Sequence, residues 1–505
     1  MKLTYFPIVF AAIMLFVSGC KKDSVERQTY EDDPKENLLK DSVFYWTKVY
    51  SLWETSLPPK DIDDLLIQST LRDYTKYFET AEDVLESLKA LTPNDPSTGN
   101  PIDRFSFIDR EGVVSGEIQD AVATSYGMYL FYLNRSTDNN ADLYVRMVDA
   151  GSPAANAGIK RGTRIKSING NSAIDYNTQA GQNFKFVNDA LNSSSMTLVI
   201  SNQGESDKTV SIQSTLYSFN PILSAKVITQ GTKKVGYLAF SSFVDVYSSG
   251  IPNQMYTRFE NIFASFQSEG INELIIDLRY NGGGSTNTAE YLADRIAPTA
   301  TNGQPMYTYK VNKLLQDEGL TAEGEAFGPV KFNKIGSINL PKVYFLVTSS
   351  TASASELLMN VLEPYMNVQL IGTFGSGGVK ENTYGKPVGF FGFEPVLGNS
   401  EVELYATSFQ MFNSKGFGDY FGGLVPDQNT YEDFLKDFGD PEEGLIAEAL
   451  YHIQNNRYYN TNSATSKIAS KDRLNSNKVI GLKAIGENAS SKGMFKFDNK
   501  KVRIR

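Results

Sequence analysis

The chain has 505 residues, of which 41% are hydrophobic and 21% charged, and its formal net charge is −10. A chain of this length is expected to form about three domains with sizeable packed cores, and its acidic balance argues against nucleic acid as a partner. Cys20 and His452 are the only cysteine and histidine. This excludes disulfides and metal sites built from several thiolates or imidazoles, and it leaves a Ser-His-Asp triad dependent on one residue late in the chain.

Residues 1–19 have the composition of a secretory signal peptide. Lys2 gives a positive start, and Tyr5–Val17 is an apolar run too short to span a bilayer. The ending Val-Ser-Gly-Cys20 resembles a bacterial lipobox, which implies cleavage before Cys20 and lipid attachment to its sulfur; a plain signal peptide with a chance cysteine is the alternative. Residues 20–37 are polar and predict a flexible tether. A lipid-anchored protein of the cell envelope follows, on the periplasmic face of the outer membrane or on the cell surface.

Residues 38–105 are predicted to form a helical N-terminal domain. Apolar residues recur there at helical spacing. Pro58-Pro59 is expected to break the first helix, and the stretch "TPNDPSTGNPID" is expected to form a loop.

Residues 106–215 change to short alternating runs such as "MYLFYL" and "MTLVIS", which predict strands separated by polar turns. The stretch "GSPAANAGIKRGTRIKSINGNS" resembles a PDZ domain, with Thr163 in place of the usual Asp. PDZ domains bind extended C-termini by adding a strand to a sheet edge. The resemblance implies that the backbone amides of Tyr126, Gly127 and Met128 hold a terminal carboxylate. A generic small β domain is the alternative.

Residues 216–436 repeat the pattern of a strand, a turn of small residues and a helix, which predicts an α/β domain. In "KVYFLVTSSTASASELLMNVLEPY" a buried strand is followed closely by a helix. A serine at that junction would lie at a helix N-terminus, where an oxyanion is stabilised. Such a serine needs a base, and because histidine is almost absent, lysine is the natural candidate. The plainer interpretation is that Thr351, Ser353 and Ser355 only cap the helix, with the help of Glu356.

Two further segments could contribute to such a site. The glycines Gly282–Gly284 in "DLRYNGGGSTN" allow close backbone approach and free amides, as a second oxyanion donor or a plain tight turn. A phosphate cradle is disfavoured because the Gly-Lys-Ser/Thr of a P-loop is missing. The segment "TFGSGGVKENTYGKPVG" offers two lysines, Lys380 and Lys386.

Residues 437–505 are predicted to form a helix and then a basic, partly disordered tail. From Gln454 onward the chain has 12 Lys/Arg against 3 Asp/Glu, in a Ser/Asn-rich context.

Taken in order, five segments resemble the carboxyl-terminal processing (tail-specific) serine peptidases, which carry a PDZ domain. They are "VGYLAFSSF", "DLRYNGGG", "TASASE", "TYGKPVG" and "GLVPD". The resemblance implies a multidomain α/β protein with a crotonase/ClpP-like peptidase core. It implies Ser353 as the nucleophile, Lys386 as the general base, and the amides of Ala354 and Gly283 as the oxyanion hole.

The sequence departs from the family pattern near the lysine. Family members usually carry a glutamine four residues past it, where this chain has Phe390. The loop before Lys386 is long, and an alternative alignment of "TFGSGGVK" would put Ser376 in the lysine's position. Lys380 as the base and Ser355 as the nucleophile remain alternatives.

The predicted function is therefore that of a serine endopeptidase whose PDZ domain captures protein substrates by apolar C-termini. A catalytically inactive homologue that only binds such C-termini is the main alternative, and a carbohydrate-binding envelope protein is a more distant one. A homo-oligomer is possible. Neither nucleic acid nor a cofactor is an expected partner.

Overall fold

The computed structural model describes residues 28–31, 33–96, 98–135, 138–375, 378–391, 402–459, 485 and 493–496. The predicted signal peptide, the lipidation candidate Cys20, Ser376 and most of the basic tail lie outside these residues. Within the described ranges, none of the helices combines the length and apolar character that crossing a membrane requires.

The central feature of the core is a six-stranded sheet with the order β22-β18-β17-β13-β10-β9. All neighbours are parallel except β9 and β10, which form an antiparallel pair. The strands are β9 (Ile222–Gln230), β10 (Lys233–Phe240), β13 (Glu273–Asp277), β17 (Lys342–Leu346), β18 (Asn367–Thr373) and β22 (Gln428–Thr430). Because both faces are covered, β13 and β17 are almost continuously apolar, as expected of buried parallel strands.

Helices cover both faces of this sheet. Ile275 and Leu346 point to one face and pack against α12 (Gly444–Asn455). Leu274 and Phe345 point to the other face, towards α8 (Gln254–Glu269), α9 (Thr286–Ile296) and α11 (Ala354–Leu362). Gly270 ends α8 in the left-handed conformation, at the residue where the sequence indicates its end.

A second six-stranded sheet packs beyond α9 and α11, with the order β14-β23-β19-β21-β15-β16. Its strands are β14 (Gly284–Ser285), β15 (Pro305–Val311), β16 (Val330–Lys331), β19 (Val388–Phe391), β21 (Thr407–Asn413) and β23 (Met494–Lys496). Strand β23 comes from the end of the chain and pairs in parallel with both β14 and β19. We call Ile485 and Gly493–Lys496 the late segment.

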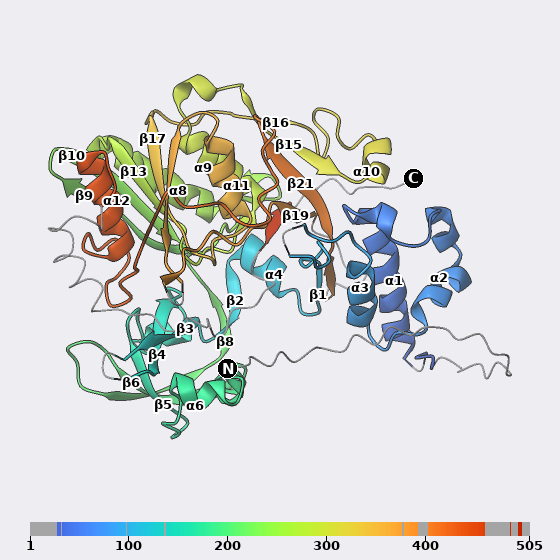
Figure 1. Cartoon of the computed structure of the whole chain (residues 1–505), viewed down its shortest axis with the longest axis horizontal. Helices are drawn as coiled ribbons and strands as arrows, with labels where there is room; N and C mark the ends of the chain where they lie inside the picture. Colours follow the sequence, from blue (N-terminus) through green and yellow to red (C-terminus); the bar gives the residue numbers. More distant parts are fainter. Residues whose placement is uncertain are drawn as a thin grey trace, which may run out of the picture.

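The N-terminal helices lie on the right of Figure 1, against the second sheet. They are α1 (Pro34–Tyr50), α2 (Gln68–Thr75) and α3 (Ala81–Lys89). Helix α1 ends at Tyr50, several residues before Pro58-Pro59, because Ser51 and Leu52 turn the chain onto the core. The Leu52 amide donates to Thr407 of β21, and the Asn312 side chain donates to the carbonyls of Val49 and Ser51.

A smaller unit, the β domain (residues 126–213), lies at the bottom of Figure 1. Its antiparallel sheet has the sequential order β3-β4-β5-β6-β7, so β3 and β7 are its edges. Its strands are β3 (Met128–Asn134), β4 (Ala141–Val148), β5 (Arg164–Ile168), β6 (Ser195–Ser201) and β7 (Lys208–Gln213). Its helices are α5 (Pro153–Asn156), α6 (Tyr176–Ala180) and α7 (Lys185–Leu191).

Short elements complete the described chain. A hairpin-like pair, β2 (Val122–Ser125) and β8 (Thr215–Ser218), leads into and out of the β domain. The others are β1 (Phe107–Asp109), β11 (Tyr247–Ser248), β12 (Ile251–Pro252), β20 (Glu403–Tyr405), α4 (Val113–Ser115), α10 (Lys313–Asp317) and the helical turns at 54–56, 62–66, 116–120 and 299–301.

Candidate active site

Ser353 lies between the end of β17 and the first turn of α11. Its backbone has φ 60° and ψ −109°, a conformation that residues other than glycine rarely adopt. The side chain is completely buried, and within the described part of the chain its Oγ has no hydrogen-bond partner. A buried hydroxyl without a partner on a strained residue is costly for the fold, and such residues cluster at functional sites.

The other hydroxyls of the same segment are occupied. The Ser355 hydroxyl lies 3.1 Å from both the carbonyl oxygen and Oδ1 of Asn281. The Thr351 hydroxyl donates to the carbonyl of Leu278 at 2.8 Å. Ser353 is thus the one hydroxyl of these three that remains available to react.

Glu356 connects the start of α11 to the loop that carries Lys386. Its Oε2 accepts from the amides of Ser353 at 2.8 Å and Lys386 at 2.9 Å. Its Oε1 accepts from the Gly385 amide at 2.8 Å and from the Thr383 hydroxyl. Burial raises the pKa of this carboxyl group, and the four donors oppose that rise. The sequence indicates only the local bond to Ser353, because the other three donors are far away in the chain.

Lys386 is 2% exposed and lies in the chain two residues before β19 begins. Its ammonium group is 4.2 Å from the ring centroid of Phe390 and 5.2 Å from that of Phe105. Cation–π contacts of this kind hold an ammonium group over an aromatic face. Phe390 therefore positions the lysine by its ring at the place where the sequence lacks the expected glutamine. Lys380, the alternative base, is exposed.

The glycine turn before β14 approaches the start of α11 closely. Gly283 has φ +108°, and a Cβ at this position would lie 2.9 Å from the Ala354 amide nitrogen. The Ala354 amide, the first of α11, has no acceptor in the described structure. The Gly283 amide donates instead to Asn281 Oδ1 at 2.9 Å. Of the two predicted oxyanion donors, Ala354 is available in this state and Gly283 is engaged.

A buried ionic network lies at Arg279, three residues before the glycine turn. Arg279 is 1% exposed and forms ion pairs with Asp277 at 2.9 Å, Glu432 at 3.0 Å and Glu443 at 2.7 Å. Arg161 of the β domain joins the network through Glu432 at 2.6 Å. Burial raises the pKa of Asp277, and the Arg279 charge opposes this rise. The sequence gives no signal for this network, because its members are spread over residues 161–443.

The predicted carboxylate-binding loop lies where the chain enters β3, in the β domain. Tyr126 is buried, and its hydroxyl donates to the carbonyl of Ser193 at 2.5 Å. The Gly127 amide donates to Ser125 Oγ at 3.0 Å. A Cβ at Gly127 would lie 2.1 Å from the Cβ of Ser152, so only glycine fits this turn. Met128 begins β3 and pairs with Val148.

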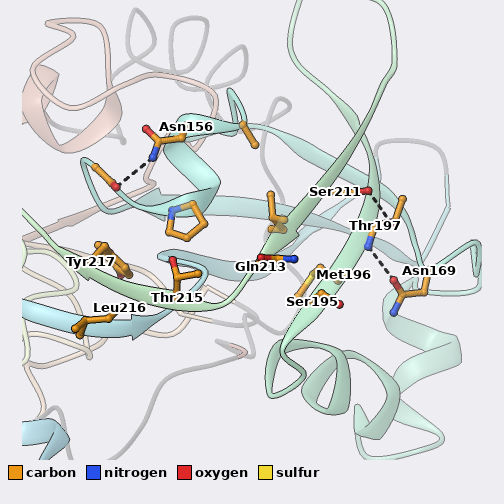
Figure 2. A pocket seen from close by; sticks show the side chains of 14 residues that line it. Asn156, Asn169, Ser195, Met196, Thr197, Ser211, Gln213, Thr215, Leu216 and Tyr217 are labelled. Carbon is orange, nitrogen blue, oxygen red and sulfur yellow. Dashed lines mark hydrogen bonds between the residues drawn. The ribbon is translucent and has the colours of Figure 1, made fainter.

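An open groove of about 980 Å³ also lies in the β domain (Figure 2). It is lined by residues of α5, β6, β7 and β8, among them Asn156, Thr197 and Tyr217. None of the predicted site residues lines it. His452 is equally separate from the Ser353 site, because it lies on α12 and its Nδ1 is 2.8 Å from the Tyr344 hydroxyl.

Comparison with known proteins places this geometry in context. Residues 234–388 match the model of peptidase family S41, and this range contains Gly283, Ser353 and Lys386. The carboxyl-terminal-processing protease of Synechocystis sp. is 27% identical over 231 residues, which are 45% of this chain and 48% of that protein. The chloroplastic carboxyl-terminal-processing peptidase 3 of Arabidopsis thaliana is 24% identical over 263 residues, 49% of this chain and 45% of that protein. The chain matches about half the length of these curated relatives.

A crystal structure from Bacteroides fragilis, assigned as an S41 protease, is similar over most of the chain. It superimposes with a TM-score of 0.60 at 25% identity, covering 82% of this chain and 97% of that one. The core of the protein therefore has the α/β fold of an S41 protease.

Proposed function

Because the chain belongs to the carboxyl-terminal processing peptidases of family S41, we propose that it is a serine endopeptidase with Ser353 as nucleophile and Lys386 as general base. One observation carries the proposal: Ser353 has a buried, unpartnered hydroxyl in a strained conformation, and Glu356 ties its amide to that of Lys386. Lys386 is the buried lysine of its loop, whereas Lys380 is exposed.

In the proposed mechanism, the Lys386 amine first comes within hydrogen-bond reach of Ser353 Oγ, which has no partner among the described residues in this state. Ser353 Oγ then attacks the carbonyl carbon of a substrate peptide while the Lys386 amine takes its proton. The Ala354 amide stabilises the oxyanion, assisted by the dipole of α11. The Gly283 amide becomes the second donor once the Asn281 side chain releases it. Lys386 then protonates the leaving amine. In the second half, the Lys386 amine takes a proton from water as the water attacks the acyl-enzyme, and it returns the proton to Ser353 Oγ as the ester bond breaks.

The β domain would act as a PDZ domain that captures an apolar C-terminus. The position of β3 at the edge of its sheet supports this role, since strand addition needs an edge strand; Ile485 already bridges to Leu130 there. A terminal carboxylate would bind the amides of the Tyr126–Met128 loop, where Ser125 Oγ now accepts from Gly127. Lipid attachment at Cys20, an envelope location and homo-oligomerisation remain proposals made from the sequence.

The test is cleavage of an unstructured protein with an apolar C-terminus by residues 28–505. We expect Ser353→Ala and Lys386→Ala each to lower kcat by about a thousandfold or more, because both groups act in the same step. Lys380→Ala is the matched control and should keep wild-type activity.

Binding to the same substrate, measured with Ser353→Ala, separates the two candidate functions. Phe390 in place of glutamine and the engaged Gly283 amide are the observations that favour a protein that only binds C-termini. Binding without cleavage of any such substrate, both by the intact wild-type chain and by the wild-type chain cut between residues 460 and 484, would refute the peptidase proposal.

A further inference from the structure

The late segment passes directly through the candidate site. Gly493–Lys496 lies between β14 and β19, and the Gly493 carbonyl accepts from the Gly284 amide at 2.7 Å. A Cβ at Gly389 of β19 would lie 2.7 Å from the Met494 carbonyl oxygen. Glycines on both sides thus leave room for the backbone of one extended strand.

This strand places a peptide carbonyl next to the proposed nucleophile. The position that a Cβ on Gly283 would occupy is 2.5 Å from the Gly493 carbonyl oxygen and 2.9 Å from the Ala354 amide nitrogen. Ser353 is the residue directly before Ala354. An extended substrate must present a carbonyl in the same neighbourhood for Ser353 to attack it.

The side chains of Met494, Phe495 and Lys496 contact different parts of the core. Met494 and Phe495 are fully buried. The Phe495 ring lies 5.4 Å from that of Phe390, the ring beneath Lys386. The Lys496 ammonium lies 5.5 Å from the ring centroid of Tyr309, and its charge opposes the rise that burial causes in the pKa of Glu290. Glu290 in turn accepts from the Tyr307 hydroxyl. Lys496 thus lies over Tyr309 and close enough to Glu290 for their charges to interact, and Tyr307 hydrogen-bonds to Glu290. We call Glu290, Tyr307 and Tyr309 the lysine pocket, since its carboxyl group suits a basic side chain.

Ile485 occupies the second place where an extended peptide would bind. Its amide donates to the Leu130 carbonyl at 3.1 Å, on the outer edge of β3. Its side chain is 2% exposed and belongs to the hydrophobic cluster of the β domain. One stretch of chain therefore adds a residue to the edge of the β domain and a strand to the sheet beside Ser353.

We propose that the gap between β14 and β19 is a binding site for an extended peptide of the pattern Gly-apolar-aromatic-Lys, and that residues 493–496 occupy it in cis. The Glu290, Tyr307 and Tyr309 pocket selects the lysine, and the intact chain is self-blocked. An intramolecular occupant competes at an effective concentration in the millimolar range, which excludes a dilute substrate. This inference rests on the proposed function, since it assigns the substrate strand of that site.

The test uses the full chain with Ser353→Ala and a recognition sequence for a specific protease inserted between residues 460 and 484. The chain folds intact, is cut, and is then dialysed to remove the released peptide. The probe is a fluorescent peptide with the sequence of residues 492–497, measured by anisotropy. We expect the probe to bind the cut protein at least about tenfold more tightly than the intact one.

Charge reversal tests the lysine pocket. A probe with Lys496→Glu should bind the cut protein about tenfold more weakly, because it opposes Glu290. Lys496→Glu in the intact chain should open the site to the wild-type probe. Lys415→Glu, which changes an exposed lysine paired with Glu363, is the matched control and should leave the site closed.

Two outcomes would overturn the inference. Equal binding to intact and cut protein would mean that the late segment does not occupy the site. Absence of probe binding to a folded cut protein would mean that β23 is a permanent strand of the sheet. Cleavage is a separate readout with Ser353 restored: a cut protein that binds the probe but hydrolyses no protein contradicts the proposed function and leaves this inference standing.

Discussion

At the scale of single residues, Phe390 stands where related peptidases usually have a glutamine that orients the lysine, and it contacts Lys386 by a different kind of interaction. An amide side chain would hold a lysine by a hydrogen bond, whereas Phe390 offers the face of a ring 4.2 Å away. Phe105 contributes a second ring from a segment that precedes the β domain, and Arg104 beside it donates to the carbonyls of Gly385 and Phe421. Two aromatic rings thus contact the ammonium group.

Phe390→Leu should therefore lower kcat about tenfold, because the cation–π contact of about 1–2 kcal/mol is lost. We expect KM to rise as well, because Phe390 pairs with Phe495 at the strand position proposed for the substrate. Phe390→Tyr should retain most of the activity, since its ring keeps the same face. Steady-state kinetics on a protein substrate measure both parameters. Phe259→Leu removes a buried ring on α8 and serves as the packing control; an equal loss of kcat in that variant would refute a specific role for Phe390.

At the scale of elements, the strand–turn–helix units could be predicted because their signals are local. The strand ending before Ser353, the glycine turn and the helix ending at Gly270 all follow from apolar runs and capping residues. The contacts between elements could not be predicted. Glu356 shows only its local cap in the sequence, and β23 has three residues, too few for a recognisable alternation. The sequence equally gives no sign that Ile485 would reach the edge of β3.

The join between the β domain and the core is also made by long-range contacts. Arg161 and Glu432 are 4% and 3% exposed in their side chains and lie 2.6 Å apart. The Arg161 guanidinium also donates to the carbonyls of Lys436 and Arg146. Breaking a buried ion pair leaves a charge without full compensation, which costs far more than breaking an exposed one.

Arg161→Ala should accordingly lower the free energy of unfolding by about 3 kcal/mol or more. The neighbouring Lys160→Ala removes an exposed ion pair with Glu205 and should cost less than about 1 kcal/mol. Denaturant titrations of the two variants, compared with the wild type, measure the difference. Similar values for both would show that the Arg161 network does not hold the β domain to the core.

At the scale of the whole molecule, several carboxyl groups outside the candidate site are buried or half-buried. Burial raises the pKa of Asp149 to about 6 and those of Glu117 and Asp294 to about 7. In an unfolded chain, aspartate and glutamate titrate near pH 4. The folded protein therefore binds more protons than the unfolded chain between about pH 4 and pH 7, and these groups make it less stable as the pH rises through that window.

Asp294→Asn should flatten this dependence, because the amide keeps an acceptor for the Asn333 amide and has no charge to bury. The drop in Tm between pH 5 and pH 8 should be smaller in this variant than in the wild type. Asp317→Asn changes an exposed residue and should reproduce the wild-type drop. An unchanged drop in Asp294→Asn would show that Asp294 is ionised throughout this range.

The four bonds of Glu356 also have a consequence for how the protein moves. Its carboxylate accepts from the amides of Ser353, Gly385 and Lys386. None of these three amides can therefore exchange with solvent until its hydrogen bond to Glu356 breaks. In a deuterium-exchange experiment the three amides should become labelled together, as one opening event. Ser353 and Lys386, the proposed nucleophile and base, would then belong to a single cooperative unit that forms and opens as one.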